Sequence, residues 1–382
     1  MRVLTIGLWV GFLAIVMVIL AIDLGVLNRG SRTISPARAL LNTGVFVFMA
    51  LAFTVVIYVV YERGLMSGGA SIAHDGSPMN GAKAATEYLS TWLLEYALSV
   101  DNLFVFTIIF GHFSVPQRYQ HRVLFWGILG ALILRGVMIG AGSALVQQFY
   151  WVLYIFGALL IYTAFKMVFA GEGHFDPSRS FMLRLARAFF PVTGELHAEK
   201  FFVHVPPETV GRPAGTGAGG GGGGGAGGLV RAATPLFLVL LVVEATDVMF
   251  ALDSIPAAFG QTREPFIIFT SNVFAIMGLR SLYFALAGLM SAFRFLKVSL
   301  ALILVFVGVK LMIAHPVGWL GFAGYHIGSG VSLGVIVTSL AAGVLASLML
   351  KRESAEEAAA HGGPVGGKPG AEASGPGEKS AG

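Results

Sequence analysis

The sequence contains no cysteine, so disulfide bonds, thiolate metal ligands and cysteine nucleophiles are all excluded. Charged residues are also scarce: they make up 12% of the chain, about half of the roughly 25% found in soluble globular proteins. The apolar share is 56% and the mean hydropathy is +0.79. These values place the chain in a lipid bilayer, where any bound metal would meet oxygen or nitrogen ligands.

Long hydrophobic runs recur along the chain, each able to supply the roughly 20 residues of a membrane-spanning helix. They begin near residues 4, 38, 87, 122, 149, 235, 266, 295 and 327. No small-residue cleavage site follows the first run, so we interpret it as a span and not as a signal peptide. The sequence therefore predicts an all-α polytopic membrane protein with about nine transmembrane helices.

Positive charge is distributed unevenly between the two predicted sides of the membrane. With the N-terminus outside, the inner segments hold fifteen Lys and Arg residues and the outer segments hold four. Excess Lys and Arg mark the cytoplasmic side, so we expect the N-terminus outside and the C-terminus inside. These residues flank spans and form no basic stripe with aromatics, so we expect no nucleic acid partner.

A glycine tract divides the membrane region into two halves. In Gly217–Gly228 only Ala218 and Ala226 are not glycine, which predicts a flexible linker without a core. Before it, residues 181–190 are typical either of an interfacial helix or of a loop helix packed on the protein. The predicted organisation is 1–64, first two helices; 65–85, extracytoplasmic loop; 86–171, first repeat; 172–233, cytoplasmic loop; 234–315, second repeat; 316–350, last helix; and 351–382, disordered tail.

The two halves carry acidic residues in the same order. Glu95 and Asp101 are six residues apart, and so are Asp247 and Asp253. Each unit has three spans, so the second begins on the opposite side of the membrane. We therefore predict two inverted three-helix repeats, an architecture that places transport sites near the membrane midplane. Pro256 is expected to disturb its helix close to Asp253.

Five carboxylates are predicted inside these apolar helices: Glu95, Asp101, Glu244, Asp247 and Asp253. Each costs about 2.5 to 3.5 kcal/mol at the bilayer centre, so something must offset them. Arg135 and Arg280 offer supporting charge pairs at equivalent positions of the two units. A purely structural clamp is one interpretation, but two arginines cannot neutralise five acids.

A metal site is the interpretation that uses all of these acids. Oxygen ligands suit hard cations such as Mn²⁺, Ca²⁺ or Mg²⁺. Residues six apart on a helix are separated by about 120° around the helix axis and by about 9 Å along it. One acidic pair therefore cannot chelate a metal ion alone. We predict a metal site where the repeats meet, open to proton exchange, with Glu95, Asp101, Asn102, Glu244, Asp247 and Asp253 as ligands.

The motifs resemble the TerC family of bacterial membrane proteins, which includes the Alx-type proteins and is placed in the LysE-like transporter superfamily. The resemblance rests on the segments Leu98–Asn102, Phe125–Arg135, Phe250–Ala257 and Ser271–Arg280. It implies an inner-membrane protein that exports Mn²⁺ for metal homeostasis, with the motif acids carrying the ion as substrate. It also leaves open a tellurite or stress-resistance complex, or export of Ca²⁺ or a cationic amino acid.

An intramembrane aspartyl hydrolase would use two aspartates on neighbouring helices. The sequence has no Gly-x-Gly-Asp segment, and such an enzyme would leave Glu95, Glu244 and Asp247 unexplained. We therefore predict a transporter in the lipid bilayer, with a divalent cation as substrate, no cofactor and no enzymatic activity.

Overall fold

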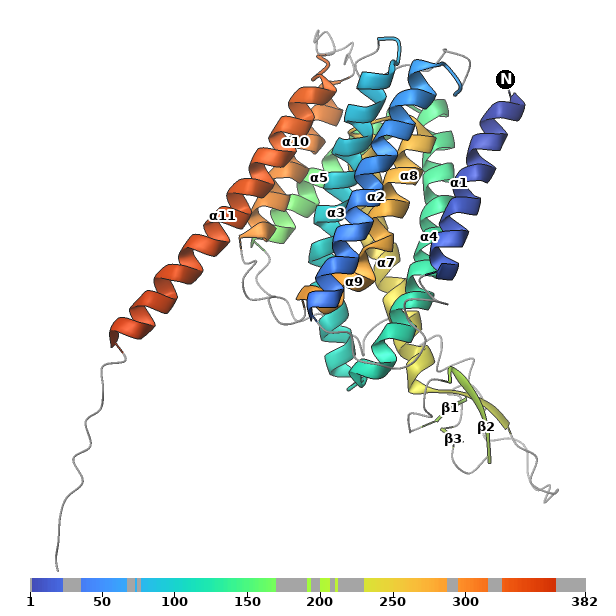
Figure 1. The fold of residues 1–382 in the computed structure, drawn as a ribbon, viewed down its shortest axis with the longest axis vertical. Helices are drawn as coiled ribbons and strands as arrows, with labels where there is room; N and C mark the ends of the chain where they lie inside the picture. The colour runs from blue at the N-terminus through green and yellow to red at the C-terminus, as the bar shows by residue number, and fades with distance from the viewer. Residues whose placement is uncertain are drawn as a thin grey trace, which may run out of the picture.

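The computed structural model describes residues 2–22, 36–66, 73, 77–169, 191–193, 200–206, 210–211, 230–286, 295–314 and 325–361. The helices are α1 (Arg2–Ile22), α2 (Pro36–Glu62), α3 (Gly81–His112), α4 (Gln117–Gln148), α5 (Val152–Phe169), α7 (Pro235–Phe259), α8 (Pro265–Met277), α9 (Leu279–Leu286), α10 (Leu296–Ile313) and α11 (Ser329–His361). The strands are β1 (Val192–Thr193), β2 (Phe202–Val205), β3 (Val210–Gly211) and β4 (Val230–Ala233). The helices form one bundle with the strands beyond one end of it (Figure 1). We call this end the sheet end and the opposite end the distal end.

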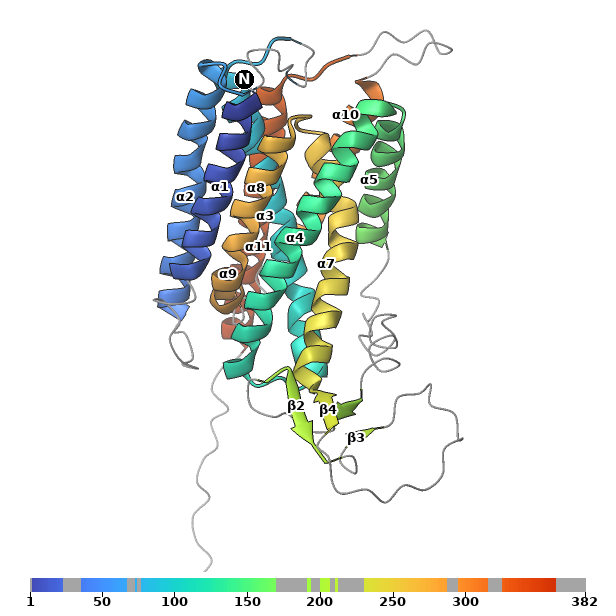
Figure 2. The ribbon, with the colours of Figure 1, turned by 90° about the vertical axis from the view of Figure 1, so that its right-hand side faces the viewer.

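Nine spans in the described part of the chain are long and apolar enough to cross a membrane, which confirms the predicted class. α8 and α9 together form one of them, and 94% of its most apolar stretch is buried, against 17% for α1. The α8–α9 span is therefore the centre of the bundle. α1 lies on the outside of the bundle (Figure 2), and many of its large apolar side chains are exposed.

Helices of the two predicted repeats pack in reciprocal pairs. α3 packs on α8, α7 packs on α4, and α5 packs on α10. The backbones of α5 and α10 meet at Gly157 and Gly308, where a Cβ on either glycine would lie 2.8 Å from the carbonyl oxygen of the other. This pairing is the one expected of two units related by a two-fold axis. The inverted repeat itself stays a prediction.

The break in the membrane helices lies elsewhere than expected. α7 runs without interruption through Pro256, so the predicted disturbance beside Asp253 is wrong. Pro256 stands in the last turn of α7, where losing one backbone hydrogen bond interrupts little helix. The break instead falls at Gly278, which separates α8 from α9 two residues before Arg280.

The loop between the two halves contains a small sheet that the sequence did not predict. Its strand order is β2-β4-β1-β3, with β1 parallel to β4 and the other pairs antiparallel. Val203, Val205 and Ala232 form a small apolar cluster in it. The glycine tract and residues 181–190 lie outside the described residues.

The last helix is longer than predicted. α11 continues to His361, past the expected start of a disordered tail at residue 351. Its apolar part, Ser329–Met349, is long enough to span the membrane, so the remaining turns extend beyond that span. Residues 362–382 lie outside the described part.

Candidate functional site

A buried ion-pair cluster lies in the core of the bundle. Arg135 of α4, only 1% exposed, forms ion pairs with Glu95 of α3 and Asp247 of α7. The contact with Asp247 is bidentate: Nη2 lies 3.1 Å from Oδ1, and Nε lies 3.3 Å from Oδ2. Bidentate guanidinium–carboxylate pairs combine strength with fixed geometry. Both acids are buried, so the pairs are shielded from water.

Two neutral side chains complete this group. Nη1 of Arg135 also donates to Ser254 Oγ at 3.1 Å and to Asn272 Oδ1 at 2.9 Å. We call Glu95, Arg135, Asp247, Ser254 and Asn272 the central cluster. The guanidinium is thus surrounded by five oxygens from α3, α7 and α8. Two carboxylates and one guanidinium give the cluster a formal charge of about −1.

Small residues bring α4 close enough to α7 for these contacts. A Cβ on Gly127 would lie 3.2 Å from Val243, and a Cβ on Gly130 would overlap the carboxylate of Glu244. Glycine at helix interfaces permits such close approach inside membranes. Glu244 precedes Asp247 by one helical turn, so it lies on the same side of α7 and against α4.

Asp101 and Asp253 lie beside the short helices α5 and α10, away from Arg135. Asp253 accepts a hydrogen bond from Thr163 of α5 at 2.8 Å and is within electrostatic range of Lys166. Asp101 is within electrostatic range of Lys297, at the start of α10. Both aspartates are partly buried.

The structure therefore gathers only part of the predicted ligand set. It brings Glu95 and Asp247 to one guanidinium, with Glu244 one turn from Asp247. Asn102 is buried in α3, one residue past Asp101. Within the described ranges, no three His, Asp or Glu side chains lie close enough together to hold a metal ion.

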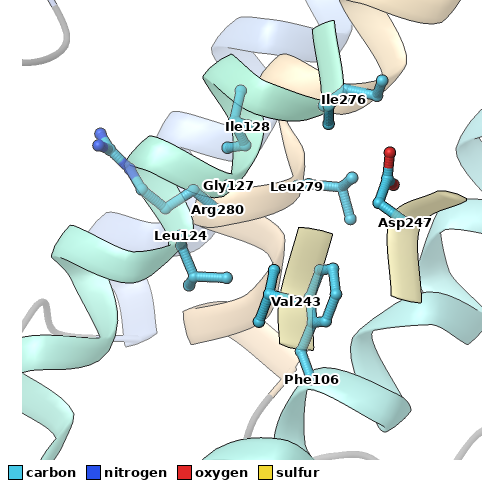
Figure 3. Close-up of a pocket in the computed structure, with 10 residues that line it drawn as sticks. Phe106, Leu124, Gly127, Ile128, Val243, Asp247, Ile276, Leu279 and Arg280 are labelled. Atoms are coloured by element: carbon cyan, nitrogen blue, oxygen red, sulfur yellow. The ribbon is translucent and has the colours of Figure 1, made fainter. Parts of the chain in front are cut away.

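Arg280 differs from Arg135 in its surroundings. It is buried and, with Asp247, lines a cavity of about 20 Å³, room for about one water molecule. Its guanidinium points away from the Asp247 carboxylate (Figure 3) and lies within electrostatic range of His121. The rest of the lining is mostly apolar, including Phe106 and Val243. Val243 precedes Asp247 on α7, so the cavity lies on the sheet-end side of Asp247.

Sequence reasoning missed two members of the central cluster. Neither Asn272 nor Ser254 was predicted to contact an arginine. A signal for Asn272 existed, because Thr270, Ser271 and Asn272 are consecutive polar residues in an otherwise apolar helix, α8. Buried polar side chains in a membrane helix need partners, which points to a polar neighbour.

Comparison with known proteins identifies the family. Residues 80–355 match the integral membrane protein TerC family. The chain belongs to the TerC family. It is 41% identical over 350 residues to "Uncharacterized membrane protein STKORF319" of Myxococcus xanthus, which covers 91% of this chain and 94% of that relative. It is 40% identical over 332 residues to the Escherichia coli K12 protein named "Putative membrane-bound redox modulator Alx", covering 86% and 90%. No solved structure matches the chain.

The TerC match begins one residue before α3 and runs into α11, so it contains the whole central cluster and leaves out α1 and α2. α1 and α2 are weakly buried spans, as are α5 and α11 within the matched region. The part of the chain that is shared with the TerC family is therefore the part that surrounds Arg135.

Proposed function

We propose that this protein transports a divalent metal cation across the bacterial inner membrane, and that it exports Mn²⁺ from the cytoplasm. The observation that carries the proposal is the set of five oxygens around the Arg135 guanidinium. Carboxylate, amide and hydroxyl oxygens are ligands that suit Mn²⁺, Mg²⁺ and Ca²⁺. The family resemblance contributes the identity of the ion and the outward direction.

In this proposal the Arg135 guanidinium occupies the cation site when no cation is bound. Charge balance favours the exchange. With the guanidinium in place the cluster carries a formal charge of about −1, whereas a divalent cation between Glu95 and Asp247 brings it to zero. The carboxylates need a counter-charge in either state, because an unpaired buried charge is strongly unfavourable. Arg135 must therefore swing aside as the cation binds.

The cavity beside Asp247 supports a route from the sheet end, which is the cytoplasmic side under the predicted orientation. It reaches Asp247 from that side and is bordered by Gly127 and Arg280. Asp101 and Asp253 stay in the proposal as acids along the route, next to α10 and α5. A transported cation would pass them as it approaches or leaves the central cluster.

The name of the Escherichia coli relative attributes redox modulation to that protein. This chain has no cysteine, so no thiol carries such a role here. Mn²⁺ is itself a redox-active ion, and its export is compatible with a redox effect. This proposal therefore needs no thiol chemistry.

Cell manganese content tests the proposal. Expression in a manganese-sensitive bacterium should lower total cell manganese, measured by mass spectrometry, and Asp247→Asn or Glu95→Gln should abolish the decrease. Glu62→Gln is the matched control: Glu62 Oε2 accepts from the Gly81 backbone N–H at 2.9 Å, and a glutamine keeps that acceptor. Unchanged manganese with the wild-type protein present in the membrane would sink the proposal. Full export by Asp247→Asn would sink the assigned site.

A further inference from the structure

One hydroxyl group of α3 differs from the others of that helix. Thr86, Ser90, Thr91 and Thr107 each donate to the backbone carbonyl four residues earlier, at 2.7 to 3.0 Å. Such bonds are a common arrangement for serine and threonine inside a helix. Ser99 is 0% exposed, yet its Oγ has no hydrogen-bond partner among the described residues. Its hydroxyl therefore remains available to a ligand inside the bundle.

Ser99 lies on the face of α3 that carries Glu95. Four residues follow one another at intervals of four, three and four, the spacing that places side chains on one face of a helix: Glu95, Ser99, Asn102 and Phe106. α3 runs toward the sheet end (Figure 2). With a rise of about 1.5 Å per residue, Ser99 lies about 6 Å from Glu95 in that direction, and Phe106 about 16 Å.

Both ends of this face take part in contacts already assigned to the transport site. At one end, Glu95 binds the Arg135 guanidinium in the central cluster. At the other end, Phe106 lines the cavity shown in Figure 3, which we call the sheet-end cavity. The Phe106 ring also lies 6.4 Å from the Phe250 ring of α7. Ser99 is therefore placed between the sheet-end cavity and the central cluster.

Asn272 of α8 has a second polar group of this kind. Its Oδ1 accepts from Arg135 Nη1 at 2.9 Å, whereas its Nδ2 has no hydrogen-bond partner in the described part of the chain. The same Nη1 contacts Glu95, so Asn272 lies beside Glu95, one helical turn from Ser99. Buried polar groups almost always have partners. Two such groups near one carboxylate point to a polar ligand.

The two groups differ in what they can bind. A serine hydroxyl oxygen can ligate a hard divalent cation directly. An amide N–H group repels a bare cation but donates to the oxygen of a water molecule. Together, Ser99 and Asn272 therefore suit a cation that still carries part of its water shell.

We propose that Ser99 is a ligand of the transported cation and binds it, partly hydrated, between the sheet-end cavity and the central cluster. This inference rests on the proposed function. The Ser99 oxygen replaces one water of the ion, and Asn272 Nδ2 donates to another. The ion gives up further waters at Glu95 and Asp247, once Arg135 has moved aside. Small hard cations lose water reluctantly, so a ligand on the route divides the dehydration into two steps.

Removing the hydroxyl separates a ligand from a structural residue. A buried hydroxyl without a hydrogen bond destabilises the folded protein, so Ser99→Ala should unfold at the wild-type temperature or higher. Its Mn²⁺ export, measured with the purified full-length protein in proteoliposomes, should fall by about tenfold, a loss typical when a group that supports a metal ion is removed. Ser90→Ala is the control, because Ser90 is equally buried on α3 but bonds to its own helix at 2.8 Å. It should export at the wild-type rate.

The absence of cysteine allows a test by gain of function. Ser99→Cys places the only thiol of the chain at this position. Thiolate prefers soft ions, whereas the oxygens of the wild type suit hard ones. Cd²⁺, a soft ion, should therefore inhibit Mn²⁺ export by Ser99→Cys at a concentration about tenfold lower than it inhibits the wild type or Ser90→Cys.

Three results would overturn this inference alone. They are wild-type export by Ser99→Ala, a lower unfolding temperature of Ser99→Ala, which would make the residue structural, and equal sensitivity of Ser99→Cys and Ser90→Cys to Cd²⁺. A wild-type protein that moves no Mn²⁺ would overturn the proposed function as well.

Discussion

Arg135 and Arg280 stand at equivalent positions of the two halves, 145 residues apart, yet they have different surroundings. Arg135 lies between two carboxylates and accounts for five hydrogen bonds, whereas the Arg280 guanidinium points away from Asp247 (Figure 3). The equivalent arginines of the two halves therefore have different roles in the packing, one inside the acidic centre and one outside it. Under the proposed function, withdrawal is the movement that Arg135 must make to admit a cation.

Removing each arginine in turn should give the largest contrast. Arg135→Met leaves Glu95 and Asp247 buried without their counter-charge, and breaking a buried ion pair in this way costs about 3 to 5 kcal/mol. Arg280→Met should cost clearly less, because its guanidinium is directed away from Asp247. Thermal unfolding of both variants in the same detergent measures the difference. Equal losses would show that the two arginines are equivalent after all.

A smaller change tests the position of Glu244. In Gly130→Ala the new methyl group overlaps the Glu244 carboxylate and must push it aside. Because alanine favours a helix over glycine by about 1 kcal/mol, the variant should stay folded. If Glu244 belongs to the transport site, displacing its carboxylate should lower Mn²⁺ export by about two- to tenfold. Gly140→Ala on the same helix is the control, since a Cβ there meets nothing within 4 Å. Unaltered export in Gly130→Ala would remove Glu244 from the transport site.

The smallest expected effect concerns the peripheral acid Asp253. Thr163→Val removes the 2.8 Å hydrogen bond to its carboxylate and should lower the free energy of unfolding by about 0.5 to 1.5 kcal/mol. Thr338→Val is matched to it, because the Thr338 hydroxyl bonds only to backbone carbonyls of its own helix at 2.7 and 3.2 Å. Thr163→Val should lose its effect in an Asp253→Asn background if the two side chains act as a pair.

The membrane spans and the key acids could be predicted from sequence because both depend on local pattern. Apolar runs of sufficient length indicated all nine spans, and the cost of buried carboxylates directed attention to Glu95 and Asp247. The prediction that Asp101 and Asp253 join them required both acidic pairs to meet at one site. α3 and α7 stay regular, so residues six apart face different neighbours, and Asp253 contacts α5.

The remaining features depend on contacts between distant segments. Asn272 reaches Arg135 only because α8 packs on α3 and α4, and the span lengths alone do not fix that arrangement. The sheet was missed because its strands have two to four residues, too few for an alternating apolar pattern to be recognised. Gly278 interrupts the α8–α9 span without a proline to mark the place.

The sheet changes what the glycine tract can do. β3 precedes the tract and β4 follows it, and both strands pair with β1. Two strand spacings, about 10 Å, therefore separate the flanks of the tract, whatever its length. Doubling the length of such a closed loop costs only about 0.6 kcal/mol. The tract can thus grow or shrink between related proteins while the spacing of α5 and α7, and with it the geometry around Arg135, is left unchanged.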